Sequence, residues 1–276
     1  MQLNNQEFRK LGNIHTIPGV ECDIQHAQIA QNVKRPYKYI QDLSVWNVRK
    51  DINIALVGGG PSLCDHLDEL RKFDGVIVAC GSVHDYLVKN KIISNYAVVC
   101  DPDIIASNYL KYPNKNTHYL VATLCHNKVF ETLAGVALTM WHCWDGDLEF
   151  LKSVDDRYMA ISGGCTVGLR SLNIAVGMGY KNIHFFGFDS CVDLDKHHAY
   201  EFNSDEKLGR LYEVKLDSSS SKTYICEGYH LGQVRDFQDF YFYHRKKFNP
   251  VFHGSGYLSD VFNVLVANIK EQEQNG

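Results

Sequence analysis

The chain has 276 residues, of which 45% are hydrophobic and 22% charged, a composition typical of globular rather than disordered proteins. Its 28 Lys and Arg against 32 Asp and Glu give a formal net charge of −4, which argues against a strongly basic surface of the kind that coats DNA or membranes but is compatible with a local basic patch. The first residues are polar, no apolar run approaches the roughly 20 residues needed to cross a bilayer, and the cysteines stand singly. We therefore expect a cytoplasmic protein without a membrane span.

Residues 1–50 show little hydrophobic periodicity, and we expect an N-terminal extension that lies over the main body. From residue 51, short apolar runs alternate with amphipathic segments. Such runs, rich in β-branched residues, are typical of the buried strands of a parallel sheet. The predicted strands are 52–57, 76–80, 96–100, 119–123, 136–140 and 183–186, and the predicted helices between them are 64–73, 83–89 and 166–178.

This alternation predicts an α/β fold, with a Rossmann-like, doubly wound, mostly parallel sheet as a nucleotide-binding core over residues 51–190. Residues 191–276 are less regular and are expected to form a lid or acceptor segment with closing helices packed on the core. A helix is predicted near 234–247, a strand at 250–253 and a last helix after Ser259 or Asp260. Ligands of such sheets bind beyond the carboxyl ends of the strands, so the residues that follow each strand are the candidates.

The first candidate is the loop Gly58-Gly59-Gly60-Pro61-Ser62, directly after the first predicted core strand. Glycines allow a sharp turn and a close approach of the backbone to a ligand, and proline suits the first turn of a helix. The free N–H groups of that helix would face a phosphate, with Ser62 adding a hydroxyl. The loop is neither a Walker loop nor a G-x-G-x-x-G fingerprint, and a plain tight turn is the alternative.

Two carboxylates, Asp101 and Asp103, follow the third predicted strand. Such a pair can hold Mg²⁺ or Mn²⁺ bridging the oxygens of a phosphate, as Asp-x-Asp does in many nucleotide-sugar transferases. Alternatively, Asp101 contacts a ribose or base while Asp103 only caps the next helix.

A second glycine-led helix start, Ser162-Gly163-Gly164-Cys165-Thr166, opens the apolar helix predicted at 166–178. The N–H groups of this helix also suit an anion, so Ser162, Gly163, Gly164 and Thr166 are predicted to bind the nucleotide. The alternative is a helix cap with close packing of the helix on the sheet.

Asp189 stands at the end of the last predicted core strand and is a candidate for contact with the nucleotide or a metal. His197 and His198 follow shortly after. Because they are adjacent, only one is expected to face a shared site, and His198 is the candidate.

These elements, in this order, resemble the 6-hydroxymethylpterin diphosphokinase-like (MptE-like) family over about residues 51–200. The resemblance rests on ALVGGGPSL, on VACGSVHDYLVKNKI with AVVCDPD, and on SGGCTVGLRSLNIAVGMGYKNIHFFGFDS with HHAY. The family includes archaeal enzymes that move a diphosphate from ATP to a pterin alcohol, and motility-associated proteins thought to glycosylate flagellin. Its core is similar to bacterial sialyltransferases that use a CMP-sugar.

The sialyltransferase resemblance also implies roles for single residues. The first loop there reads G-N-G-P-S, so Gly59 departs from the pattern and puts one contact to the donor in doubt. Ser162-Gly163 matches a nucleotide contact. The catalytic histidine precedes a helix, which makes His230 its plausible counterpart, although Gln233 could take that position.

Three functions remain open. In a glycosyltransferase the nucleotide departs, with His230 or His198 as the base and Asp101/Asp103 with a metal, or tyrosines, at the departing phosphate. In an ATP-dependent pyrophosphokinase AMP departs, and a metal is required. A non-catalytic nucleotide-binding module is the third. The glycine loops lack a Lys/Arg cluster for a triphosphate, which favours the glycosyltransferase.

The acceptor is left open among small molecules, glycans, proteins and nucleic acids. Residues 241–248 (YFYHRKKF) interleave aromatic and basic side chains and could contact an anionic acceptor, but the solvated end of a helix has the same pattern. A homo-oligomer is compatible with the sequence, which does not fix the oligomeric state.

Overall fold

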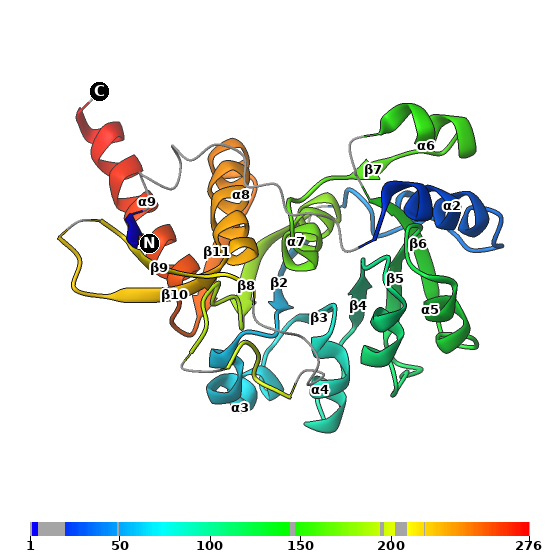
Figure 1. Cartoon of the computed structure of the whole chain (residues 1–276), viewed down its shortest axis with the longest axis horizontal. Coiled ribbons are helices and arrows are strands. Elements are labelled where there is room, and N and C mark those ends of the chain that lie inside the picture. Colours follow the sequence, from blue (N-terminus) through cyan, green and yellow to red (C-terminus); the bar gives the residue numbers. More distant parts are fainter. Residues whose placement is uncertain are drawn as a thin grey trace.

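The computed structural model describes residues 2–4, 20–48, 50–143, 147–193, 196–201, 209–217 and 219–275. Within them, eight parallel strands form one sheet in the order β11-β8-β2-β3-β4-β5-β6-β7 (Figure 1). These strands are β2 (Lys50–Val57), β3 (Val76–Cys80), β4 (Tyr96–Val99), β5 (His118–Ala122), β6 (Leu138–Cys143), β7 (Ala160–Ile161), β8 (Tyr180–Phe186) and β11 (Asn249–His253). The α/β fold with a mostly parallel sheet, predicted from the alternation, is thus confirmed.

The strand order places a switch point between β2 and β8. The strands from β3 to β7 follow one another on one side of β2, whereas β8 pairs with the other side of β2. The loops after these two strands therefore meet at the carboxyl edge of the sheet. The N–H of Gly58 donates to the carbonyl of Phe186, and that of Gly60 to the carbonyl of Gly187, each at 2.8 Å. A Cβ on Gly58 would lie 2.6 Å from the Gly187 oxygen, so a side chain there would separate the two loops.

Helices cover both faces of the sheet. In Figure 1, α3, α4 and α5 lie below the row of strands, whereas α2, α6, α7 and α8 lie above it. The lower helices are α3 (Leu67–Arg71), which follows the 3₁₀ turn η2 (Pro61–His66), α4 (Val83–Lys89) and α5 (Asn127–Thr132), with the 3₁₀ turn η3 (Ile104–Tyr109) between the last two in the chain. The others are α2 (Cys22–Asn32), α6 (Leu148–Val154), α7 (Val167–Gly177), α8 (Gly228–His244) and α9 (Tyr257–Asn275).

Helix α7 lies over the middle of the sheet, where it packs against β2, β3, β4 and β8. Leu169, Leu172 and Ala175 recur at helical spacing and are buried on the sheet, which explains why this segment is a helix with one apolar face. Thr166 is its N-cap and accepts a hydrogen bond from the N–H of Leu169 at 3.4 Å. The start of α7 is thereby fixed close to the switch point.

A small second sheet was not predicted. It consists of β1 (Gln2–Asn4), β9 (Leu211–Lys215) and β10 (Thr223–Glu227), with β9 and β10 antiparallel. The polar residues of β9 hide the alternation from which a strand is recognised. Because β10 runs directly into α8, that helix begins at Gly228 rather than near residue 234.

Residues 20–48 bury part of their length in the main core. Ile29 on α2 is buried there, as are Tyr39 and Ile40 at the 3₁₀ turn η1 (Ile40–Asp42). The N–H of Met140 on β6 donates to the carbonyl of Lys38 at 2.8 Å, so this segment adds backbone pairing beside β6. Residues 5–19 of the predicted extension lie outside the described residues.

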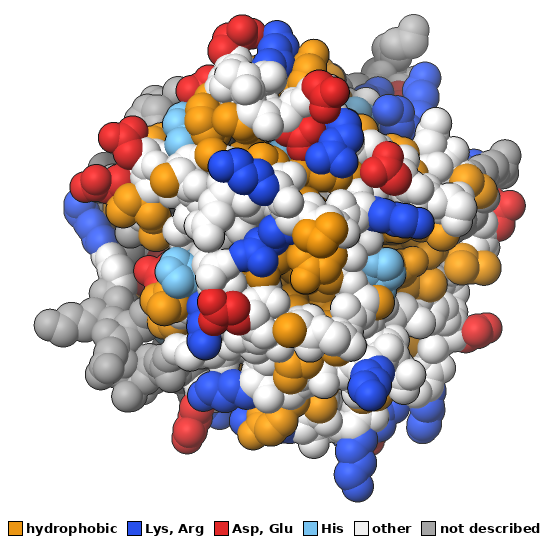
Figure 2. All heavy atoms as spheres, turned by 90° about the vertical axis from the view of Figure 1, so that its right-hand side faces the viewer, with side chains coloured by type: hydrophobic (Ala, Val, Ile, Leu, Met, Phe, Trp, Pro, Cys, Tyr) orange, Lys and Arg blue, Asp and Glu red, His pale blue; other side chains and the backbone are white. Residues whose placement is uncertain are grey.

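Figure 2 shows the end of the molecule that lies on the right of Figure 1, where α2, α5 and α6 gather. Basic and acidic side chains are interspersed there among apolar ones, without one extended basic patch. Three basic side chains of these segments lie over aromatic rings: Arg35 over Phe130, Lys152 over Tyr158 and Arg157 over Tyr39. No helix in the described ranges is long and apolar enough to cross a membrane.

Candidate functional site

A pocket opens at the carboxyl ends of β2, β3 and β8, where the starts of α7 and α8 meet. Seven of the residues predicted to bind or catalyse line it: Gly58, Gly59, Gly60, Thr166, Asp189, His198 and His230. Its described lining contains no Lys or Arg. Any anion held here would therefore be bound by N–H groups, hydroxyls and imidazoles rather than by fixed positive charge.

Gly59 is fixed by the segment that carries His198. Its carbonyl accepts a hydrogen bond from the N–H of Ala199 at 2.9 Å and lies 3.3 Å from Nδ1 of His198. A Cβ at Gly59 would lie 2.6 Å from the hydroxyl of Tyr200, which itself contacts the Ser82 hydroxyl at 2.7 Å. Packing against Tyr200 thus explains why a glycine stands here. The N–H of Gly59 has no acceptor among the described residues.

The helix start at Ser62 is occupied by the protein's own carboxylate. Asp189 accepts hydrogen bonds from the Ser62 N–H at 2.7 Å and from its hydroxyl at 2.5 Å. Burial raises the pKa of Asp189, although the bonds from Ser62 favour its ionised form. Ser62 therefore binds the loop after β8. Its predicted contact to a phosphate would require its hydrogen bonds to Asp189 to break.

The start of α7, in contrast, opens on the pocket. Thr166, Val167 and Gly168 line it, and the N–H groups of Val167 and Gly168 have no acceptor in the part of the chain that the structure describes. These N–H groups carry the positive end of the helix dipole. Phe188 packs against Gly168 on α7 and against Gly58 after β2, so one ring spaces the two loops.

The residues before Thr166, from Ser162 to Cys165, do not line this pocket. The Ser162 hydroxyl accepts a hydrogen bond from the Asn173 amide at 2.9 Å, and Gly163 packs against the backbone of α7. Gly164 lies against the carboxylate of Asp236 on α8, which accepts the N–H of Cys165 at 3.1 Å. Their binding of a nucleotide remains a prediction; in this structure they fix the approach of the chain to α7.

His230 is 5% exposed, and its hydrogen bonding defines its tautomer. Its Nδ1 lies 3.1 Å from the N–H of Glu227, which can only donate, so Nδ1 accepts and the neutral ring carries its proton on Nε2. Burial lowers the pKa of His230 to about 3, with His197 and His198 adding to the effect. The ring is therefore a neutral donor, and the predicted role of His230 as a base remains a prediction that this geometry does not favour.

The sequence favours His198 over its neighbour His197, yet both line the pocket. Nδ1 of His197 lies 3.2 Å from a carboxylate oxygen of Glu227, the N-cap of α8, and its Nε2 is buried without a partner among the described residues. Burial lowers the pKa of His198, and His197 lowers it further. Because Glu227 is distant in the chain, no local pattern around His197 marks the pair.

Two more pocket residues, Ser190 and Gln233, are joined by a hydrogen bond. Ser190 has a φ of +52°, unusual for a residue other than glycine, and its hydroxyl donates to the side-chain oxygen of Gln233 at 2.9 Å. Strained backbone of this kind gathers at functional sites. The bond ties the loop after β8 to the first turns of α8.

Asp101 and Asp103 are not among the pocket residues. Asp101 accepts the N–H of Asp103 at 2.9 Å, and Asp103 accepts the N–H of Ile105 at 2.8 Å as the cap of η3. Desolvation raises the pKa of Asp101, and the charge of Asp103 adds to this rise. Each carboxylate thus has an oxygen committed to the backbone, and the described ranges hold no group of three or more His, Cys, Asp or Glu side chains suited to a metal. The predicted Mg²⁺ or Mn²⁺ gains no support from this arrangement.

The segment at residues 241–248 lies at the far end of α8 from the pocket. Tyr243 is 78% exposed and Phe242 is also exposed, whereas Tyr241 packs against Phe248 and Phe262. Most of the length of α8 separates Tyr243 from His230, which corresponds to about 20 Å at the rise of an α-helix. Contact of this segment with an acceptor remains a prediction.

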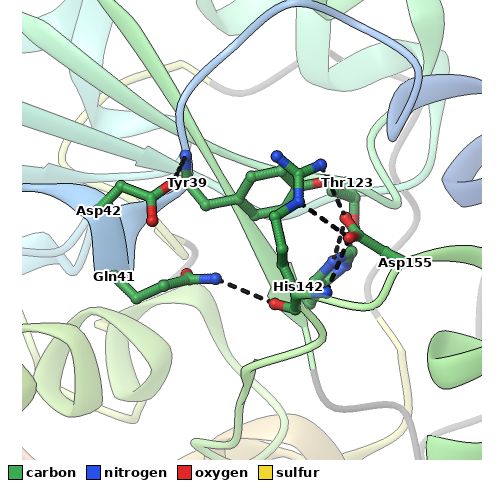
Figure 3. Close-up of polar contacts among 7 residues, drawn as sticks. Tyr39, Gln41, Asp42, Thr123, His142 and Asp155 are labelled. Atoms are coloured by element: carbon green, nitrogen blue, oxygen red, sulfur yellow. Dashed lines mark hydrogen bonds and ion pairs between the residues drawn. The ribbon is translucent and has the colours of Figure 1, made fainter.

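A second polar cluster joins Thr123, His142 and Asp155, so that a hydroxyl, an imidazole and a carboxylate follow one another as in a hydrolase triad (Figure 3). Its role is nevertheless structural. His142 lies 2.9 Å from the Thr123 hydroxyl and 3.3 Å from the Asp155 carboxylate, which also binds Arg157. Thr123 and His142 are fully buried, and the ring of Tyr39 lies over His142, so no substrate reaches the hydroxyl. The cluster joins the segment before β2 to β5, β6 and the loop after α6.

The comparisons with known proteins agree with this architecture. A solved structure described as "MAf glycosyltransferase from Magnetospirillum magneticum AMB-1" superposes with a TM-score of 0.64 at 15% sequence identity. The match covers 84% of this chain but 37% of that one, so this chain spans well under half of that protein. At this identity the likeness shows the fold. No curated protein matches the chain.

The sequence itself matches a family described as 6-hydroxymethylpterin diphosphokinase MptE-like over residues 26–195, more than half of the chain. The match begins within α2 and ends beyond the loop after β8. It therefore includes the segment before β2, with the buried Tyr39, and both loops of the switch point. The chain belongs to the MptE-like family.

Proposed function

We propose that this chain is a nucleotide-dependent transferase that moves a sugar from a nucleotide-sugar donor to an acceptor hydroxyl. The observation that carries the proposal is the start of α7. Its two unpaired N–H groups, together with that of Gly59, open into a pocket at the switch point of the sheet. Such N–H groups suit the phosphate of a nucleotide. The fold shared with a structure described as a glycosyltransferase supports the same function.

The residues that line the pocket favour a donor whose phosphates carry little negative charge. The titratable residues of the lining are one carboxylate, two cysteines, one tyrosine and three histidines, and its described part has no Lys or Arg to offset a triphosphate. The alternative, an ATP-dependent pyrophosphokinase, needs that charge neutralised while the alcohol attacks. It would require a metal at a place where the described carboxylates do not gather. A non-catalytic nucleotide-binding module is the remaining alternative.

A ligand panel followed by thermal unfolding tests the proposal. UDP-N-acetylglucosamine, GDP-mannose, CMP-N-acetylneuraminic acid and ATP are each added with and without Mg²⁺, because a ligand that binds the folded form raises its melting temperature. We expect at least one nucleotide sugar to stabilise the protein and to be consumed, with release of free nucleotide. Stabilisation by ATP alone with release of AMP would point to the pyrophosphokinase. Stabilisation without turnover of any ligand would leave a binding module.

A matched pair of variants tests whether the donor binds at the start of α7. Val167→Pro removes one of the two unpaired N–H groups at the first turn of α7, a position that proline tolerates. Cys22→Pro makes the same change at the exposed first position of α2, which also follows a residue with extended backbone and does not line the pocket. We expect weaker donor binding in the first variant and unchanged binding in the second, with both variants folded.

A further inference from the structure

We propose that His197, held by Glu227, is the base that removes the proton from the acceptor hydroxyl, and that His230 instead donates a hydrogen bond to the departing nucleotide phosphate. This assignment rests on the proposed function and names the residues that carry its chemistry. It differs from the expectation from sequence, which placed the base at His230 or His198.

The orientation of the His197 ring leaves one nitrogen able to accept a proton. Its Nδ1 lies 3.2 Å from one oxygen of the Glu227 carboxylate, while the other oxygen accepts the N–H of Gly209. A carboxylate accepts only, so we assign the proton of the neutral ring to Nδ1 and the lone pair to Nε2. That Nε2 is buried and has no partner among the described residues, and His197 lines the pocket. An unpaired buried acceptor beside a pocket is what a proton-abstracting group requires.

The surroundings of His197 also suit the charge that forms during the reaction. A base becomes an imidazolium, and the Glu227 carboxylate, 11% exposed, stabilises that cation at close range. Within the part of the chain that the structure describes, the titratable groups in contact with or near His197 are Glu227, the adjacent His198 and His230, whose ring centroid is 6.4 Å away. Nδ1 of His198 faces the carbonyl of Gly59, and Nδ1 of His230 faces an N–H. His197 is therefore the ring of the three that has a carboxylate beside it.

The roles of His197 and His230 are then complementary. Glu227 directs both: its carboxylate orients His197, and its backbone N–H occupies Nδ1 of His230. His230 therefore presents an N–H, which suits an oxyanion. In the step, the acceptor hydroxyl gives its proton to Nε2 of His197 while its oxygen bonds to the anomeric carbon. The bond from that carbon to the phosphate oxygen breaks, and its electron pair leaves with the nucleotide.

A test that needs no ligand is the tautomeric state of the rings. Nitrogen-15 NMR of the imidazoles at neutral pH is expected to find the proton of His197 on Nδ1 and that of His230 on Nε2. A proton on Nε2 of His197 would overturn the base role, whether or not the protein is a transferase.

The kinetic test uses the nucleotide sugar that the protein consumes, with water or a hydroxyl compound as acceptor. His197→Ala is expected to lower kcat by about 10²–10⁴-fold, to leave donor affinity within about threefold, and to remove the loss of rate on the acidic side of the pH profile. Glu227→Gln is expected to lower kcat by a smaller factor and to keep a pH profile. The matched control is His118→Ala at the first residue of β5, outside the pocket lining, for which we expect unchanged turnover.

Two results separate failure of this assignment from failure of the proposed function. If the wild-type protein consumes a nucleotide sugar and His198→Ala, rather than His197→Ala, removes the acidic limb, the base is His198 and the assignment is wrong. If the wild-type protein consumes none of the nucleotide sugars, the proposed function itself is wrong, and the assignment falls with it.

Discussion

The carboxylate of Asp189 accepts hydrogen bonds from both the backbone N–H and the hydroxyl of Ser62, at 2.7 and 2.5 Å. The two residues are 127 positions apart and follow β8 and β2, the strands on either side of the switch point. The pair therefore joins the two loops at the carboxyl edge of the sheet, and Ser62 stays outside the pocket lining while the start of α7 faces the pocket.

Loss of the Ser62 hydroxyl is expected to weaken this closure. Ser62→Ala leaves the buried carboxylate of Asp189 with one donor fewer, so we expect a loss of about 1–3 kcal/mol in the free energy of unfolding, measured in urea. The control is Ser107→Ala, which removes an exposed hydroxyl bonded to the carbonyl of Ile104 and should cost less than about 0.5 kcal/mol. Equal losses in the two variants would show that the Ser62–Asp189 pair contributes nothing particular.

The contact between Gly59 and Tyr200 predicts coupled substitutions. Gly59→Ala places a methyl group against the Tyr200 hydroxyl and is expected to cost about 1–3 kcal/mol of stability. Tyr200→Phe removes the atom closest to that methyl, so Gly59→Ala should cost less in the Tyr200→Phe background, by about 0.5–1 kcal/mol. A double-mutant cycle of urea unfolding measures this coupling, and strictly additive effects would contradict the contact.

The buried cluster around Asp155 predicts an acid-dependent stability. Burial favours the neutral carboxyl, but the Tyr39 hydroxyl and Arg157 outweigh it and lower the pKa of Asp155 to about 2. A lowered carboxyl pKa stabilises the fold at pH values above the unfolded-state pKa, and this stabilisation is lost as the pH falls from about 4 towards 2. Asp155→Asn should therefore cost about 2 kcal/mol at pH 7 and about half as much at pH 3. A cost independent of pH would contradict the prediction.

His230 affects stability at higher pH than Asp155 does. The unfolded chain protonates this histidine near pH 6.5, whereas burial holds its folded pKa at about 3, so the unfolded state binds more protons between these values. Its contribution to stability is present near pH 7 and decreases as the pH falls below about 6.5, by about 2 kcal/mol at pH 5. His230→Asn keeps an acceptor for the Glu227 N–H but does not titrate. Its unfolding free energy should fall less between pH 7 and pH 5 than that of the wild type, and identical slopes would contradict this.

The core of the fold was predictable because its strands are short, apolar on both faces and separated by helices. Residues 76–80 were predicted as a strand and form β3, and the helix predicted at 83–89 is α4. The hairpin of β9 and β10 was missed, because its polar residues are held by pairing with one another and with β1 rather than by burial of an alternating face.

The site was predictable only as a position at the edge of the sheet. Glycine loops after strands identified the region, since glycine is recognisable in the sequence. Whether an N–H group at this edge is free depends on acceptors that lie far along the chain. Asp189 is the acceptor for Ser62, and Asp236 is the acceptor for Cys165. For the same reason His197 could not be distinguished from His198 without Glu227.

The proposed function depends above all on the N–H groups of Gly59, Val167 and Gly168, which would hold the phosphate of a nucleotide sugar. The most direct test is the amide NMR spectrum of the labelled protein titrated with the nucleotide sugar that stabilises it. We expect these three amide signals to move together, to saturate with one dissociation constant and to respond far more than Gly135, which lies in a turn outside the pocket lining. Saturable shifts confined to residues outside the pocket, with these three signals unmoved, would contradict it.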